Sequence, residues 1–348
     1  MYDIASLDDG WWSELFETKV TSAQPTRIGD GLVGMNLRYV LHGDNVPTSV
    51  VVKLPSEDPT SRATGIALRN YEREVKFYND IAATVDVRAP RCYFADWHEG
   101  AGDFVIVLED MAPAEQGNQI TGCGIAHART AVAELARLHG PRWNDATLWT
   151  IDWLQRRTET DGATQLKGIF QMVKPGFLAT FGEALHDVAG DSGTRLIDEL
   201  EQALDGYIAA KDEPFTVTHG DYRLDNMLFG GAGGGVPCAV VDWQTPGHGN
   251  GISDLAYFIG AGLLPDDRRR HEWDLVDLYI DGIESYGHTV DVEWVRTHYR
   301  REALSGVVMA VVASQIVQRT DRGDQMFTAM ATRHALQALD HGSIALCG

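Results

Sequence analysis

Alternating apolar and polar positions mark the first third of the chain as rich in strands. Leu37, Tyr39 and Leu41 alternate with polar or smaller residues, a His-Gly-Asp-Asn turn follows, and residues 49–54 form a valine-rich run. This order predicts a β-hairpin. A helix is predicted over about residues 64–84, with an apolar stripe formed by Ala67, Tyr71, Tyr78 and Ile81. With a buried strand predicted at 104–108, these elements form a small α/β unit.

Helical periodicity dominates after residue 111. It predicts helices at residues 125–139, 194–210, 273–286 and 292–317. Two short apolar runs, 226–229 and 239–243, flank the glycine-rich residues 230–235, and because no helix follows, the glycines predict a hairpin turn and not a phosphate loop. We therefore expect two regions, residues 1–111 and 112–348.

One polar segment in the second region carries a recognisable chemistry. Residues 218–226 read T-H-G-D-Y-R-L-D-N, and V-V-D-W-Q follows at 240–244. Phosphoryl transfer to an alcohol needs a carboxylate to orient the hydroxyl and accept its proton, and oxygen ligands for the magnesium ions that bridge the phosphates. Asp221, Asn226 and Asp242 supply that set.

The strings HGDYRLDNMLF, VVDWQ and DLAYF resemble the superfamily of aminoglycoside phosphotransferases and choline kinases, and most closely its ecdysteroid kinase-like branch. The resemblance implies an α+β, two-lobed protein kinase-like fold with a small β-rich N-lobe and a large, mostly helical C-lobe. It also implies ATP and Mg²⁺ as cofactors. Matched to the kinase pattern, Asp221 is the catalytic base, Asn226 and Asp242 are metal ligands, and Arg223 stabilises charge near the transferred phosphate.

A kinase also needs a lysine for the α- and β-phosphates and a helix glutamate to hold it. Lys53 interrupts the valine-rich strand, as the lysine of V-A-I-K does. Glu74 falls on the apolar stripe of the following helix, whereas Glu72 points away from it. Because Glu74-Val75-Lys76-Phe77-Tyr78 also resembles the E-x-x-F-Y signature of this branch, we expect an ion pair between Lys53 and Glu74.

Two further segments are nucleotide-binding candidates. Residues 29–34 satisfy G-x-G-x-x-G, with Gly31 and Gly34 as cofactor-binding candidates; a strand-like pattern follows where a dinucleotide site needs a helix, and a simple surface turn is the alternative. Glu109, Asp110 and Met111 end the last strand of the first region, where a kinase chain crosses between lobes. Their backbone groups are expected to bind adenine.

Two neighbouring segments bear on the catalytic loop and on the type of substrate. Asp254 in DLAYF is expected to cap a helix or brace the catalytic loop, and His139 is expected to be structural. Only eleven residues separate Asp242 from Asp254, and no A-P-E segment follows. Little room is left for an activation loop and a peptide platform, so a protein substrate is not expected.

Composition limits the partners. Fifty acidic and 29 basic residues give a net charge of −21, which disfavours nucleic acid and anionic membranes; a cationic small molecule remains possible, and so does a role in solubility alone. The four cysteines have no Cys-x-x-Cys spacing, the N-terminus lacks a signal-peptide pattern, and the most apolar stretch, 306–317, is too short to span a bilayer. A cytoplasmic location without membrane insertion is expected.

Two other functions remain open at this stage. One is a non-catalytic nucleotide-binding module, and the other is a metal hydrolase that uses His219, Asp221, Asp242 and His248. The residues do not identify the acceptor, which could be an antibiotic, an amino alcohol, a sugar, a sterol or a hydroxyacyl compound. By analogy with the branch, the motif variant favours a lipophilic or metabolic alcohol.

Overall fold

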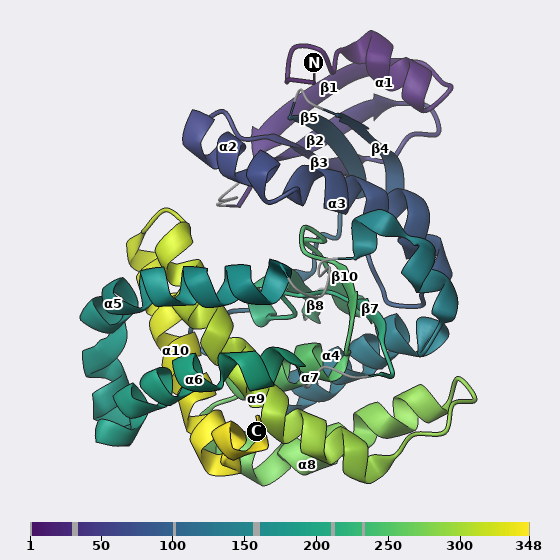
Figure 1. Cartoon of the computed structure of the whole chain (residues 1–348). Coiled ribbons are helices and arrows are strands. Elements are labelled where there is room, and N and C mark those ends of the chain that lie inside the picture. Colours follow the sequence, from purple (N-terminus) through teal and green to yellow (C-terminus); the bar gives the residue numbers. More distant parts are fainter. Residues whose placement is uncertain are drawn as a thin grey trace.

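The computed structural model describes residues 2–29, 34–99, 102–155, 161–209, 213–231 and 234–347. Figure 1 shows a sheet-rich region, formed by the N-terminal part of the chain, above a larger helical region. Within the described ranges, no helix is both long and apolar enough to cross a membrane.

The first region is built on one antiparallel five-stranded sheet of order β1-β2-β3-β5-β4. Its strands are β1 (Val20–Arg27), β2 (Gly34–Gly43), β3 (Ser49–Pro55), β4 (Cys92–His98) and β5 (Asp103–Glu109). The predicted hairpin is confirmed as β2 and β3, with Leu37 opposite Val52. The predicted strand at 104–108 is confirmed as β5.

The single helix expected over residues 64–84 is wrong. The segment contains α2 (Pro59–Ala67), α3 (Asn70–Lys76), a π-helical turn (Phe77–Ile81) and a 3-10 turn (Ala82–Thr84). The break lies at Arg69, whose backbone is left-handed with φ 58° and cannot continue a right-handed helix. The change of direction leaves Ala67 exposed, while α3 keeps Glu74 buried against the sheet.

The second region consists mainly of helices. Its α-helices are α4 (Ile125–His139), α5 (Asp161–Ala189), α6 (Asp191–Ala209), α7 (Ile252–Gly262), α8 (Pro265–Glu284), α9 (Val292–Ile316) and α10 (Asp321–His341). The four predicted helices at 125–139, 194–210, 273–286 and 292–317 correspond to α4, α6, α8 and α9. Helices α5 and α10 were not predicted from the sequence. Figure 1 shows α5 along the side of this region that faces the sheet.

Short strands support the segment between α6 and α7. They are β6 (Glu115–Gln116), β7 (Thr216–Thr218), β8 (Met227–Gly231), β9 (Gly234–Val240) and β10 (Gly247–Gly249), with β6-β8-β9 in one sheet and β10-β7 in another. The antiparallel pairing of β8 with β9 confirms the predicted hairpin across the glycine-rich stretch. The remaining short helices are α1 (Asp9–Leu15) and 3-10 turns at Gly140–Arg142, Ala146–Thr150, Asp152–Leu154, Leu224–Asn226 and Ser343–Leu346.

A continuous apolar core joins the two regions. It includes Phe77 and Phe104 from the first region and Tyr222 and Trp243 from the second. The rings of Phe77 and Trp243 stack with centroids 3.8 Å apart, and such aromatic pairs add to the free energy that area burial provides. The segment after β9 is thereby fixed against the helices that follow β3.

Candidate active site

The segment 219–226 forms a loop between β7 and β8, and the side chain of Asp254 binds the beginning of this loop. The two carboxylate oxygens of Asp254 accept the backbone N–H groups of His219 at 2.7 Å and Gly220 at 3.0 Å. Gly220 has φ 80°, a conformation that favours glycine. Asp254 thus braces the loop, as expected, while Gly251 and not Asp254 is the N-cap of α7.

Three side chains surround the carboxylate of Asp221. Its Oδ1 accepts the hydroxyl of Tyr257 at 2.9 Å, its Oδ2 accepts Nδ2 of Asn226 at 2.9 Å, and Nε of Arg223 lies 3.1 and 3.0 Å from the two oxygens. Burial would lower the pKa of Arg223, but the Asp221 carboxylate raises it above its ordinary value. The carboxylate is therefore held in one orientation by charged and neutral donors.

Asn226 and Asp242 supply oxygen atoms that suit a magnesium ion. Nδ2 of Asn226 also donates to the backbone oxygen of Asp221 at 2.9 Å, which fixes the amide. The N–H of Val241 bonds the backbone oxygen of Asn226, so the two segments are adjacent. Within the described ranges, Oδ1 of Asn226 and Oδ2 of Asp242 accept no hydrogen bond from the protein, and carboxylate and amide oxygens are the ligands that Mg²⁺ prefers. The donor set fits the ion.

Lys53 connects both regions through two carboxylates. Its Nζ lies 2.5 Å from Oε1 of Glu74 and 2.9 Å from Oδ1 of Asp242, which is 189 residues away in sequence. The predicted ion pair with Glu74 is confirmed; the contact with Asp242 adds a second partner. We call these three residues the lysine junction.

Burial and charge act in opposite directions at the lysine junction. Burial alone would lower the pKa of Lys53, but Asp242 and Glu74 together raise it. For Asp242, burial favours the neutral acid, yet the ammonium of Lys53 keeps the pKa below its usual value. Burial dominates at Glu74, which is fully buried, and raises its pKa. The ammonium thus offsets part of the cost of burying Glu74, whereas the side chain of Asp242 is 37% exposed and reaches water.

Trp243 and Gln244 follow Asp242 where the D-F-G pattern of protein kinases has phenylalanine and glycine, and both make contacts with the first region. Trp243 stacks on Phe77, and Oε1 of Gln244 accepts a hydrogen bond from Nδ2 of Asn70 at 3.1 Å. Both contacts reach the helices that carry or follow Glu74. The Trp-Gln pair therefore ties the position of Asp242, whose own φ is 66°, to that of Glu74.

The glycine-rich segment lies between two antiparallel strands. Gly31 lies outside the residues that the structure describes, and Gly34 begins β2. A Cβ atom at Gly34 would lie 3.3 Å from the backbone oxygen of Leu54, a tight contact. A strand and not a helix follows the glycines, as the sequence pattern predicts, so the segment lacks the helix that a dinucleotide loop needs. Binding of phosphates by Gly31 and Gly34 stays a prediction.

The side chains at the end of β5 have partners inside the protein. Glu109 pairs with Arg88 at 2.7 Å, and Asp110 pairs with Arg38 at 2.7 Å. The N–H of Glu109 and the carbonyl of Met111 are also hydrogen-bonded internally. In the chain as described, the N–H of Met111 has no such partner. This N–H is therefore a donor that is available to adenine.

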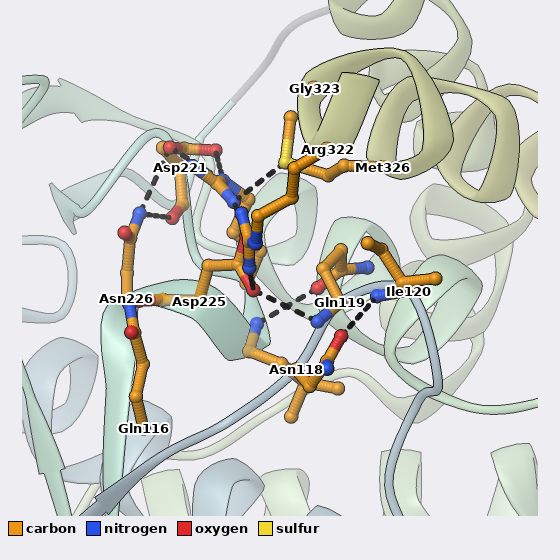
Figure 2. Close-up of polar contacts among 12 residues, drawn as sticks. Gln116, Asn118, Gln119, Ile120, Asp221, Asp225, Asn226, Arg322, Gly323 and Met326 are labelled. Atoms are coloured by element: carbon orange, nitrogen blue, oxygen red, sulfur yellow. Dashed lines mark hydrogen bonds and ion pairs between the residues drawn. The ribbon is translucent and has the colours of Figure 1, made fainter. Parts of the chain in front are cut away.

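Figure 2 shows residues around the loop that the sequence did not single out. Asp225 is buried and accepts hydrogen bonds from Arg223 at 2.8 Å, Arg322 at 3.0 Å and the N–H of Gln119 at 2.9 Å. Tyr257 stands one turn after Asp254 on α7, inside the quoted DLAYF string, so its position was readable. Nothing in the local pattern around Gln119 or Arg322 indicated a role at the loop.

The metal-hydrolase alternative does not agree with the side-chain contacts. Both ring nitrogens of His219 have partners, the N–H of Asp221 at 3.3 Å and the carbonyl of Val241 at 3.1 Å. Nδ1 of His248 instead lies 3.1 Å from Oε1 of Gln155. Within the described ranges, no three His, Cys, Asp or Glu side chains gather as a metal site. His139 is buried beside Tyr279, which fits a structural role.

Comparisons with known proteins agree with this architecture. Residues 33–288 match the ecdysteroid kinase-like family. A 72-residue segment is 32% identical to acyl-CoA dehydrogenase family member 11 of Gallus gallus, covering 21% of this chain and only 9% of that protein's length.

Two solved structures share the fold over most of the chain. A candidate aminoglycoside phosphotransferase of Ralstonia eutropha JMP134 has a TM-score of 0.56 at 15% identity and covers 98% of this chain and 99% of its own. Choline kinase of Cryptosporidium parvum Iowa II has a TM-score of 0.53 at 12% identity, with 92% and 89% covered. The α+β fold is thus the two-lobed, kinase-like one, with a small β-rich N-lobe and a large, mostly helical C-lobe. Since the family match spans well over half of the sequence, the chain belongs to the ecdysteroid kinase-like family.

Proposed function

We propose that this protein is an ATP- and Mg²⁺-dependent phosphotransferase that phosphorylates a hydroxyl group of a small molecule. The observation that carries the proposal is the lysine junction. One buried ammonium joins a helix carboxylate of the N-lobe to Asp242 of the C-lobe, and Asp242 follows a segment that is hydrogen-bonded to Asn226. A triphosphate with its metal needs this combination of cation, carboxylate and amide.

Each residue has a proposed task in nucleotide binding. Lys53 binds the α- and β-phosphates, and Glu74 holds its ammonium in place. Asn226 and Asp242 would hold Mg²⁺, which supplies charge neutralisation between the phosphates when it is bound. Removal of either metal ligand should therefore weaken productive nucleotide binding.

The proposed chemistry centres on Asp221. Its carboxylate orients the acceptor hydroxyl and accepts its proton as the hydroxyl oxygen bonds to the terminal phosphorus of ATP, while the bond from that phosphorus to the bridging oxygen breaks and ADP leaves. Tyr257, Asn226 and Arg223 keep the carboxylate in place, and the guanidinium of Arg223 stabilises the negative charge of the transferred group. Because these donors are fixed before substrate arrives, little reorganisation is needed during the reaction.

The proposal extends to the rest of the cleft. We place the lobe boundary at residue 111, with the N–H of Met111 as a donor to adenine and the neighbouring peptide groups of Glu109 and Asp110 lining the same edge. Gly31 and Gly34 would border the phosphates. The short stretch after Asp242, which lacks a peptide platform, supports a small-molecule acceptor, and a cytoplasmic location is part of the proposal.

The test is a screen for phosphate transfer. Terminally labelled ATP is incubated with Mg²⁺, the protein and a panel of amino alcohols, sugars, sterols and hydroxyacyl compounds, with Asp221→Asn as the matched blank. The proposal predicts label on one class of alcohol with the native protein and none with the variant. MgATP binding without any transfer would favour the non-catalytic module, and equal transfer by both proteins would remove Asp221 from its role.

A further inference from the structure

A second charged cluster connects the catalytic loop to α10. It consists of Asp221, Arg223, Asp225 and Arg322, and we call it the arginine network. Figure 2 shows Arg322 reaching from the first turn of α10 to Asp225, beneath Asp221. Arg322 and Asp225 are 97 residues apart in sequence, so only the fold brings them together.

Two carboxylates fix the plane of the Arg223 guanidinium. Nε faces Asp221, and Nη1 donates to Oδ2 of Asp225 at 2.8 Å and contacts Sδ of Met326 at 3.1 Å. A guanidinium is a rigid planar fork, so two anchored nitrogens determine where the third points. Within the described chain, Nη2 of Arg223 donates no hydrogen bond to the protein, which leaves two N–H groups for an anion.

Asp225 is held more firmly than an ordinary loop carboxylate. Its Oδ1 accepts from the N–H of Gln119 and from Arg322, and its backbone oxygen accepts Nε2 of Gln116 at 2.6 Å. Burial would raise the pKa of Asp225, but the hydrogen bond from Arg322 and the charge of Arg223 hold it below its usual range. The carboxylate is thus a fixed, ionised anchor for Arg223.

Arg322 also changes the charge balance. Asp221 and Asp225 flank a single guanidinium, so without Arg322 the three groups would carry one net negative charge where a phosphoryl group must approach. The second arginine, whose side chain is 50% exposed, makes the arginine network neutral. In a partly buried site, one uncompensated charge strongly affects the binding of another.

We propose that Asp225 and Arg322 are positioning residues for phosphoryl transfer. Asp225 aims Arg223 so that its free amino group meets the transferred phosphoryl group, and Arg322 holds Asp225 and cancels its charge. This inference rests on the proposed function, because it assigns no task to α10 unless a phosphoryl group is transferred beside Asp221.

The test uses a mimic of the group in transfer. Binding of MgADP is measured by calorimetry with and without aluminium fluoride, which occupies the position of the transferred phosphoryl group. The native protein should bind MgADP more tightly when fluoride is present. Arg322→Gln should keep the affinity for MgADP alone. The increase in affinity that aluminium fluoride causes should be about tenfold smaller, the effect of one charge-assisted hydrogen bond. Arg322→Lys should restore part of this increase.

A matched control lies three residues before Arg322, just ahead of α10. Arg319 is 57% exposed and pairs with Asp324 outside the arginine network, so Arg319→Gln should keep the full fluoride-dependent gain. Asp225→Asn should lose more of the gain than Arg322→Gln, about a hundredfold, because Arg223 then loses one of its two charged anchors and keeps only Asp221. If Asp225→Asn does not fold, the comparison of Arg322→Gln with Arg319→Gln still tests the proposal.

The outcomes separate the two proposals. A gain that survives in Arg322→Gln, or that falls equally in Arg319→Gln, overturns the positioning role and leaves the proposed function intact. A native protein that binds no MgADP, or shows no gain, overturns both. A crystal structure of Arg322→Gln adds a readout independent of ligands, since the guanidinium of Arg223 should rotate away from its position between Asp221 and Asp225.

Discussion

The lysine junction and the arginine network both join distant parts of the chain, but they differ in exposure. In the first, the side chains of Lys53 and Glu74 are 9% and 0% exposed; in the second, Arg322 is half exposed. Removing one partner of a buried pair leaves an uncompensated charge and costs several kcal/mol, whereas an exposed partner leaves water as a substitute. The lysine junction therefore combines stability with its proposed role in nucleotide binding, while the arginine network can be altered at Arg322 with little loss of stability.

The largest expected effect is on chemistry. Asp221→Asn should lower phosphate transfer about a thousandfold, because loss of a positioned general base costs between two and four orders of magnitude. The affinity for MgATP should stay within about twofold, since the hydrogen bonds described for Lys53 and Asp242 do not involve this side chain. Turnover and equilibrium binding of the same preparation check both statements. A variant that lost binding and turnover together would place Asp221 in the nucleotide site.

The next effect tests burial at the lysine junction. Lys53→Met should lower the free energy of unfolding by about 3 kcal/mol, because Glu74 is then buried without its cation. Urea unfolding at neutral pH measures it. Lys76→Met is the matched control: Lys76 pairs with Glu72 and is 33% exposed, so the cost should stay below about 1 kcal/mol. Equal losses of unfolding free energy in both variants would show that burial does not increase the contribution of the ion pair to stability.

A smaller effect is expected at Tyr257. Tyr257→Phe removes the hydroxyl that donates to Asp221 and keeps the ring stacked on His334, so the maximal rate should fall about tenfold with little change in stability. In the control Tyr207→Phe, a buried hydroxyl bonded to Glu302 is lost, which should lower stability but not the rate per folded molecule. A rate unchanged in Tyr257→Phe would show that the hydroxyl does not orient the carboxylate.

The smallest effect concerns pH. Burial lowers the pKa of His334 from 6.5 to about 3, so the unfolded chain binds a proton below about pH 6.5 that the folded protein does not bind. Stability is unaffected above that pH and decreases as pH falls from 6.5 towards 3. The expected loss between pH 6.5 and 5.5 is about 1 kcal/mol. His334→Asn should flatten this part of the urea-unfolding profile; an unchanged slope would assign it to other groups.

The lysine junction was predictable from the sequence because its members stand in local patterns. Lys53 interrupts an apolar strand, and Glu74 lies on an apolar helical stripe, so each position is unusual for a charge. The strands were also predictable from local patterns, since alternation marks β2 and short apolar runs mark β3 and β5. Strand β1 was missed because most of it is exposed.

The arginine network could not be predicted in this way. Arg322 is a half-exposed residue in the first turn of α10, where an arginine is ordinary, and its partner Asp225 lies 97 residues earlier. The break at Arg69 was missed because arginine favours helices and only its left-handed backbone reveals the turn. Contacts that depend on how helices pack across long sequence separations leave no periodic pattern in the residues themselves.

Titration of ATP into the native protein and into Asp242→Asn, each with and without Mg²⁺, tests most directly whether the lysine junction belongs to a nucleotide site. We expect the native protein to bind ATP more tightly when Mg²⁺ is present, and the variant to lose that dependence. Absence of ATP binding by the native protein, or the same magnesium dependence in the variant, would contradict the account.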